Sequence, residues 1–289
     1  MFVDAIQRVG GFTRAIHSIA KKPLSNQIEK GAATLFFVNN QGWALTCKHV
    51  AQWISQADQI NRKYESFRSE LKHGKVAEQE LMDKYSLSTN QAVEMRITFV
   101  DCVDRIEKIH FFNHPVYDLA LLKFEGFEKI QCSNFPVFAE TDQTIQPGQM
   151  LCRLGFPFPE FSNFKWDASL QQLLWTKDGQ ARSPRFPIEG MVTRFLGDKA
   201  GKVYGIEMST PGLRGQSGGP LFDGEGRIAG MQSRTKHLHL GFDIEEKEIV
   251  AHGTPKKVND YAFIHLGECI HVSVIKAFLD SHQVSYQIG

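Results

Sequence analysis

The sequence predicts an all-β fold, a sandwich or barrel of many short strands. Apolar, β-branched and aromatic runs recur along the 289 residues, and turn-forming residues separate them at short intervals. They do not alternate with the long helical patterns that a parallel α/β sheet requires. The strand-like runs are residues 33–38, 43–46, 94–100, 106–112, 119–124, 150–154, 188–195, 203–208, 220–222, 227–233 and 261–265.

Four segments depart from the strand pattern. Apolar residues at helical spacing predict a short helix over residues 2–9, closed by Gly10-Gly11, and a packed terminal helix over residues 271–281. Residues 55–92 are dense in Lys, Glu, Gln and Ser and poor in Gly and Pro, so we expect a helical insertion there. Residues 160–187 are polar, aromatic and interrupted by proline, which predicts a long surface loop.

The charge balance argues against nucleic acid or a membrane surface as the main partner, because 33 basic residues face 32 acidic ones. No run approaches the roughly 18–20 apolar residues of a membrane span. Asp4 and Arg8 interrupt any secretory signal core near the start. The five cysteines form no CxxC pair, so we expect reduced thiols and a cytoplasmic location.

The most informative stretch is Gly215-Gln216-Ser217-Gly218-Gly219-Pro220. A serine hydroxyl becomes a good nucleophile only when a base removes its proton, and the resulting oxyanion needs preorganised donors. Glycines beside the serine allow a sharp turn that can aim the amides of Gly215 and Ser217 into one small hole. This stretch also fits Gly-x-Ser-x-Gly, the nucleophile elbow of α/β-hydrolases. That elbow needs a helix after the serine, however, and here Gly-Gly-Pro and a hairpin follow.

Two upstream segments supply a base and an acid. His49 follows an apolar strand in Thr46-Cys47-Lys48-His49-Val50, and Asp118 opens the apolar run Leu119-Ala120-Leu121-Leu122. A partly buried carboxylate needs a partner, and an imidazole N–H is a suitable one that would also fix the histidine tautomer. The order is His, Asp, Ser, whereas α/β-hydrolases have Ser, acid, His.

These three segments together resemble the signature segments of trypsin-like (chymotrypsin-fold, family S1) serine peptidases, closest in style to the bacterial HtrA-like branch. The resemblance covers about residues 30 to 270. It implies two packed six-stranded antiparallel β-barrels, with residues 1–143 forming the first half and residues 144–289 the second. It also implies a serine endopeptidase in which Ser217 is the nucleophile, His49 the base and Asp118 the orienting acid, with Gly215 and Ser217 forming the oxyanion hole.

By the same resemblance, six residues line the substrate pocket: Pro211, Gly212, Gly230, Met231, Gln232 and Ser233. No acid stands among them, so a preference for Lys or Arg is not indicated, and a small or medium apolar side chain is expected. The strand from Met231 to Ser233 is expected to offer its edge to an extended peptide. Gln216 replaces the aspartate that pairs with a newly cut N-terminus in trypsin-type zymogens, so that activation switch is not expected.

Two alternatives stay open. His237-x-His239, with His252 and His265, resembles a metal-ligand set, but no carboxylate or cysteine completes a recognisable frame, and we expect neither a metal nor a cofactor. The second alternative is that the chain is a binding or regulatory module with the peptidase fold but without turnover, since a fold does not guarantee chemistry. The expected partners are a polypeptide substrate and, as a candidate, a separate regulatory protein.

Overall fold

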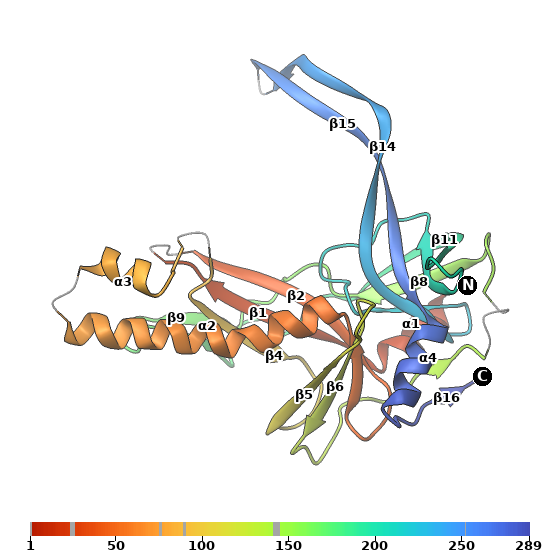
Figure 1. Ribbon diagram of the computed structural model, residues 1–289, viewed down its shortest axis with the longest axis horizontal. Coiled ribbons are helices and arrows are strands. Elements are labelled where there is room, and N and C mark those ends of the chain that lie inside the picture. The colour runs from red at the N-terminus through yellow and green to blue at the C-terminus, as the bar shows by residue number, and fades with distance from the viewer. Residues whose placement is uncertain (1, 24–26, 75–76, 89–90, 141–144, 252) are drawn as a thin grey trace.

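The computed structural model describes residues 2–23, 27–74, 77–88, 91–140, 145–251 and 253–289. Two antiparallel β-barrels, a helical insertion, a long two-stranded arm and a C-terminal helix make up this part of the chain (Figure 1). The expected all-β class with two barrels is therefore confirmed. The expected boundary between residues 143 and 144 lies outside the described residues.

The first barrel is a six-stranded sheet in the order β4-β1-β2-β3-β6-β5, with every neighbouring pair antiparallel. Its strands are β1 (Thr13–Lys21), β2 (Ile28–Phe37), β3 (Trp43–Thr46), β4 (Glu94–Phe99), β5 (Lys108–Asn113) and β6 (Ala120–Glu125). β1 was not predicted. Its first seven residues are all buried, so it lacks the alternation that marks a half-exposed strand.

The second barrel closes on itself. Its six strands follow the order β13-β8-β11-β12-β15-β14, and an additional β13–β14 pairing joins the two ends. The strands are β8 (Met150–Gly155), β11 (Phe186–Gly197), β12 (Val203–Met208), β13 (Pro220–Phe222), β14 (Ile228–Ala251) and β15 (Thr254–His271). Two short parallel strands, β7 (Val137–Phe138) and β16 (Gln287–Ile288), extend the sheet beyond β14.

A single cluster of buried apolar side chains runs through both barrels. Leu45 and Leu121 contribute to it from the first barrel, and Leu154 and Leu221 from the second. Each of these four side chains is fully buried. The junction between the barrels is therefore packed core, and side chains placed on its rim are held by rigid strands.

The helical insertion was expected and is confirmed, although it begins earlier. α2 (Lys48–His73) starts directly after β3, and α3 (Glu78–Lys84) follows it. The two helices bury a small cluster of their own around Phe67, Leu81 and Met82. The predicted terminal helices are also present, as α1 (Val3–Gly10) and α4 (Val272–Ser281).

Two segments differ from the expected short strands and loop. β14 and β15 continue past the barrel and form a twisted arm that projects from the body (Figure 1). The stretch expected as a loop over 160–187 contains a small hairpin of β9 (Phe164–Asp167) and β10 (Gln172–Trp175), packed over buried Phe161 and Leu173. No helix within the described ranges combines the length and the apolar character needed to cross a membrane.

Candidate active site

The carboxylate of Asp118 is hydrogen-bonded to both the ring and the backbone amide of His49. β3 and β6 are paired so that Thr46 lies opposite Ala120, and this register places His49, at the start of α2, beside Asp118, just before β6. The imidazole Nδ1 lies 2.9 Å from Oδ2 of Asp118, and the backbone amide of His49 donates to Oδ1 at 3.0 Å. Because a carboxylate accepts at Nδ1, that nitrogen carries the proton and Nε2 is left as an acceptor.

Ser233 is a third partner of the same carboxylate. Its hydroxyl donates to Oδ2 of Asp118 at 2.7 Å. Burial works against the charged form of Asp118, but the hydrogen bonds from the His49 ring, from Ser233 and from the His49 amide outweigh it and lower the pKa of Asp118 to about 2. Asp118 is therefore an anion throughout the range in which histidine titrates. Ser233 was predicted to line the substrate pocket, and its bond to Asp118 was not foreseen.

The loop around Ser217 depends on glycine. Gly215 and Gly218 have φ values of +96° and +85°, in the left-handed region that favours glycine. A Cβ at Gly218 would overlap the carbonyl oxygen of Thr34 and the hydroxyl of Thr46. The amides of Gln216, Gly218 and Gly219 donate to the carbonyls of Leu213, Gln232 and Gln216, respectively. Among the hydrogen bonds of the described residues, none uses the amide of Gly215 or Ser217, so both remain available to bind an anion.

Thr34 on β2 joins this loop to the first barrel. Its backbone amide donates to the carbonyl of Ser217 at 3.1 Å, and its hydroxyl donates to the carbonyl of Gly215 at 2.8 Å. The same hydroxyl accepts from the amide of Phe156 at 3.2 Å. Thr34 is fully buried. Its role follows from contacts across 181 residues of sequence, and no local motif marks it.

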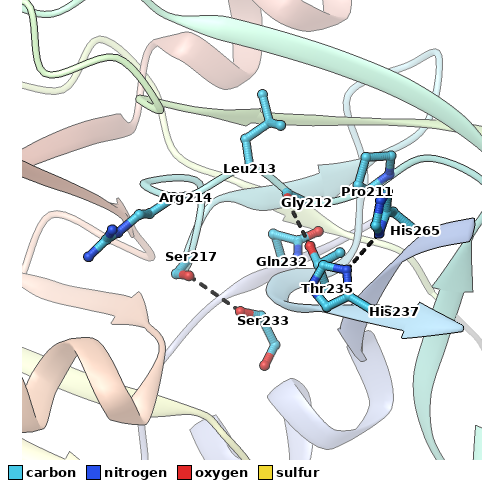
Figure 2. A pocket seen from close by; sticks show the side chains of 10 residues that line it. All are labelled: Pro211, Gly212, Leu213, Arg214, Ser217, Gln232, Ser233, Thr235, His237 and His265. Atoms are coloured by element: carbon cyan, nitrogen blue, oxygen red, sulfur yellow. Dashed lines mark hydrogen bonds between the residues drawn. The ribbon is translucent and has the colours of Figure 1, made fainter. Parts of the chain in front are cut away.

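Ser217 and His49 line the same cleft between the barrels, a space of about 1180 Å³ that Gly215 also lines. The Ser217 hydroxyl donates to the carbonyl of Ser233 at 3.3 Å (Figure 2). Within the described part of the chain no hydrogen bond joins Ser217 to His49. Catalytic hydrogen bonds are often long or misaligned before substrate binds.

Ser217 also lines a pocket that is separate from this cleft and has a volume of about 460 Å³. We call it the primary pocket. Its lining residues are Pro211, Gly212, Leu213, Arg214, Ser217, Gln232, Ser233, Thr235, His237 and His265 (Figure 2). Four of the six predicted pocket residues are among them.

The other two predicted pocket residues, Gly230 and Met231, do not line it. Both are buried and are paired on either side, with β13 and with β15. The edge of β14 that faces away from β15 is therefore occupied at these positions. A register shift between Gln232 and Arg234 follows, and this irregularity turns Ser233 toward the site.

The thiol of Cys47 lies within reach of the same centre. Ligand atoms of Cys47, His49 and Asp118 are all within 4.8 Å of one another, a spacing that a metal ion could use. Burial, however, raises the pKa of Cys47 well above its usual value, and its thiol donates to the carbonyl of Gln232 at 3.2 Å. A protonated, engaged thiol is a poor metal ligand.

The histidines considered as a metal set separate into different contacts. The Nδ1 atoms of His237 and His265 lie 2.6 Å apart, whereas His239 binds Asp243 at 2.7 Å. His252 lies outside the described residues.

Residues 33–231 match the family model of the trypsin-like peptidase domain, which is more than half of the chain. The chain belongs to this family. Two solved structures of an HtrA-type protease, AlgW, each with a tripeptide, are similar to it at 13% and 14% sequence identity. Each has a TM-score of 0.48, and each alignment covers 97% of this chain and 63% of the other. No curated protein matches.

In this trypsin-like peptidase domain the side chain before the serine forms hydrogen bonds with its own loop and with β11. Gln216 is fully buried, its amide nitrogen donates to the carbonyl of Phe186 at 3.0 Å, and its amide oxygen accepts from the amide of Leu213 at 3.0 Å. A neutral side chain with partners in the loop and on β11 therefore occupies the position before the serine. The absence of an activation switch that uses a newly cut N-terminus stays a prediction.

Proposed function

We propose that this trypsin-like peptidase domain is a serine endopeptidase with Ser217 as nucleophile, His49 as general base and Asp118 as the acid that orients the histidine. The observation that carries the proposal is the double hydrogen bond of Asp118 to His49 in the cleft that Ser217 also lines. It fixes the ring and leaves Nε2 free to accept a proton. Asp118 remains ionised and stabilises the imidazolium when it forms.

The reaction follows from these roles. Nε2 of His49 takes the proton of Ser217 as Oγ attacks the peptide carbonyl carbon, and the oxyanion is bound by the free amides of Gly215 and Ser217. The imidazolium then gives its proton to the leaving amine as the C–N bond breaks. Water, deprotonated by His49, attacks the acyl-enzyme, and the proton returns to Ser217 as the product acid leaves.

For this reaction the Ser217 hydroxyl must leave the carbonyl of Ser233 and turn toward His49, which includes a change of its side-chain rotamer. The bond that it gives up is weak, since it spans 3.3 Å. The substrate expected from this chemistry is an extended polypeptide that reaches the cleft from solvent.

The bond to Ser233 also favours the alternative, a latent or non-catalytic module whose serine is turned away from the base. Turnover of an unfolded protein substrate separates the two. The proposal predicts that wild type cleaves it and that Ser217→Ala, with unchanged thermal unfolding, loses activity by several orders of magnitude. Equal cleavage by the variant would refute the assignment of Ser217, and a folded wild type without cleavage would favour the latent module.

A further inference from the structure

Arg153 is a buried cation without an acidic partner. It lies on β8 with a fully buried side chain, and within the described ranges no carboxylate comes within salt-bridge distance of its guanidinium. Its Nη1 donates to the amide oxygen of Gln232 at 2.8 Å, and its Nη2 donates to Thr210. Its Nε is buried and has no partner among the described residues. Buried charges are normally paired, so this one requires an explanation.

Gln232 connects this cation to the primary pocket. An arginine can only donate hydrogen bonds, so its contact fixes the amide oxygen of Gln232 toward the guanidinium. The amide nitrogen must then face the other way, where one N–H donates to the carbonyl of Arg234 at 3.0 Å. Of the two N–H groups, the second has no partner within the described chain. Gln232 lines the primary pocket with its side chain almost fully buried, so a donor with a positive charge behind it lies within the pocket wall.

Two glycines allow Gln232 and Arg153 to pack directly against the backbone. A Cβ at Gly212 would overlap the amide nitrogen of Gln232, and a Cβ at Gly267 would overlap Nη1 of Arg153. The hydroxyl of Thr235 donates to the carbonyl of Gly212 at 2.6 Å and so holds that wall in place. The positions of the cation and of the Gln232 amide therefore depend on glycine at both places.

The remaining lining of the primary pocket is free of negative charge. None of its ten lining residues is Asp or Glu. His237 and His265 stand at its outer end, and the 2.6 Å between their Nδ1 atoms means that one ring must donate to the other. The neighbouring Arg234 is different from Arg153, because it is paired with Glu268.

We propose that the primary pocket binds an acidic side chain, so that the peptidase cleaves after Glu or Asp. The carboxylate accepts from the free N–H of Gln232, and Arg153 behind it supplies the counter-charge. This inference rests on the proposed function, since it assigns the pocket beside Ser217 to the residue on the amino side of the scissile bond. It replaces the apolar preference expected from the sequence, because Arg153 and its bond to Gln232 carry no sequence signal.

The test compares quenched fluorescent peptides that are identical except for Glu, Gln or Leu at that position. Glu and Gln have nearly the same shape, so their ratio of kcat/KM reports the exchange of a charged acceptor for a neutral amide. We expect the Glu peptide to be preferred over Gln by at least about tenfold, which corresponds to about 1.4 kcal/mol. Equal or better cleavage of Gln or Leu would overturn the inference while leaving the proposed endopeptidase intact.

Binding provides a measurement that needs no turnover. On Ser217→Ala, fluorescence anisotropy should show the Glu peptide bound at least about tenfold more tightly than the Gln peptide. If wild type cleaved nothing but this preference held, the proposed catalysis would fail and the assignment of the pocket would stand. Equal affinity for the two peptides would overturn the pocket assignment whatever the catalytic result.

Variants of Arg153 test whether its charge causes the preference for Glu. Arg153→Met should bring the Glu-to-Gln ratio close to one, and Arg153→Lys should retain part of the preference. Arg227→Met is the matched control, because Arg227 is ion-paired with Asp223 in the turn between β13 and β14. It should leave the ratio unchanged. If Arg153→Met does not fold, the wild-type ratio and the Ser217→Ala affinities decide the question by themselves.

Discussion

Replacing Thr34 by valine removes one hydroxyl from the junction of the two barrels and keeps the shape of the side chain. That hydroxyl donates to the carbonyl of Gly215 and accepts from the amide of Phe156. Both partners would be left unsatisfied in a buried place, at about 1–3 kcal/mol each. We therefore expect Thr34→Val to lower the free energy of unfolding by about 2–6 kcal/mol.

The same change should slow the chemistry. Without this contact the loop that carries the oxyanion-hole amides is less well fixed, and a displacement of about 1 Å can cost on the order of 10²-fold in rate. The assay is the rate of labelling by a fluorophosphonate, measured beside urea unfolding. Thr34→Ser, which keeps the hydroxyl, should recover most of the labelling rate.

Thr13→Val is the control for this experiment. Thr13 is equally buried in the same barrel, and its hydroxyl makes one bond, to the carbonyl of Val9, away from the serine loop. It should lose about 1 kcal/mol of stability and label at the wild-type rate. If Thr34→Val also labelled at the wild-type rate, the reasoning that Thr34 positions the loop would be refuted.

Two further predictions concern titratable groups. Asp118→Asn should reduce kcat by about 10⁴-fold through loss of the correct histidine tautomer. The pKa of Asp118 is lowered to about 2, so its ionised form also stabilises the fold by about 2 kcal/mol. That stabilisation is present above about pH 4 and is lost as the pH falls toward 2. Burial lowers the pKa of His17 to about 4, so between about pH 6.5 and 4 the histidine is protonated in the unfolded chain but neutral in the folded one. About 3 kcal/mol of folding stability is therefore lost as the pH falls from about 6.5 to 4. His17→Phe should flatten that loss.

Urea unfolding measured from about pH 6.5 down to about pH 2 tests both titration predictions. For Asp118→Asn the stability difference from wild type should shrink at the acid end, and a constant difference would contradict the assigned pKa. For His17, whose ring stacks on Phe161 at 4.1 Å between centroids, an acid slope that His17→Phe leaves unchanged would show that other groups cause it.

Local patterns predicted much of the fold because strand signals are local. The runs over 203–208 and 220–222 match β12 and β13, and the charged stretch over 55–92 contains most of α2 and all of α3. β1 escaped prediction because it is buried on both faces. The sequence predicted only two brief strands where the long arm of β14 and β15 stands. The outer half of the arm is exposed and charged and packs against no barrel, so its sequence lacks the alternation of apolar and polar residues that marks a strand.

The candidate site divides in the same way. Ser217, His49 and Asp118 each stand in a short motif, and those motifs could be found one at a time. Thr34 and Arg153 could not be found in this way, because their importance comes from strands that pair far apart in the sequence. The paired position of Met231 likewise depends on the closure of the second barrel.

The most direct test of the central claim is fluorophosphonate labelling followed by mass spectrometry of the modified peptide. The account predicts that the wild-type chain is labelled at Ser217 alone, that Ser217→Ala is not labelled, and that His49→Ala is labelled far more slowly. A folded wild type without label, or a label on another serine, would contradict the claim that His49 and Asp118 activate Ser217.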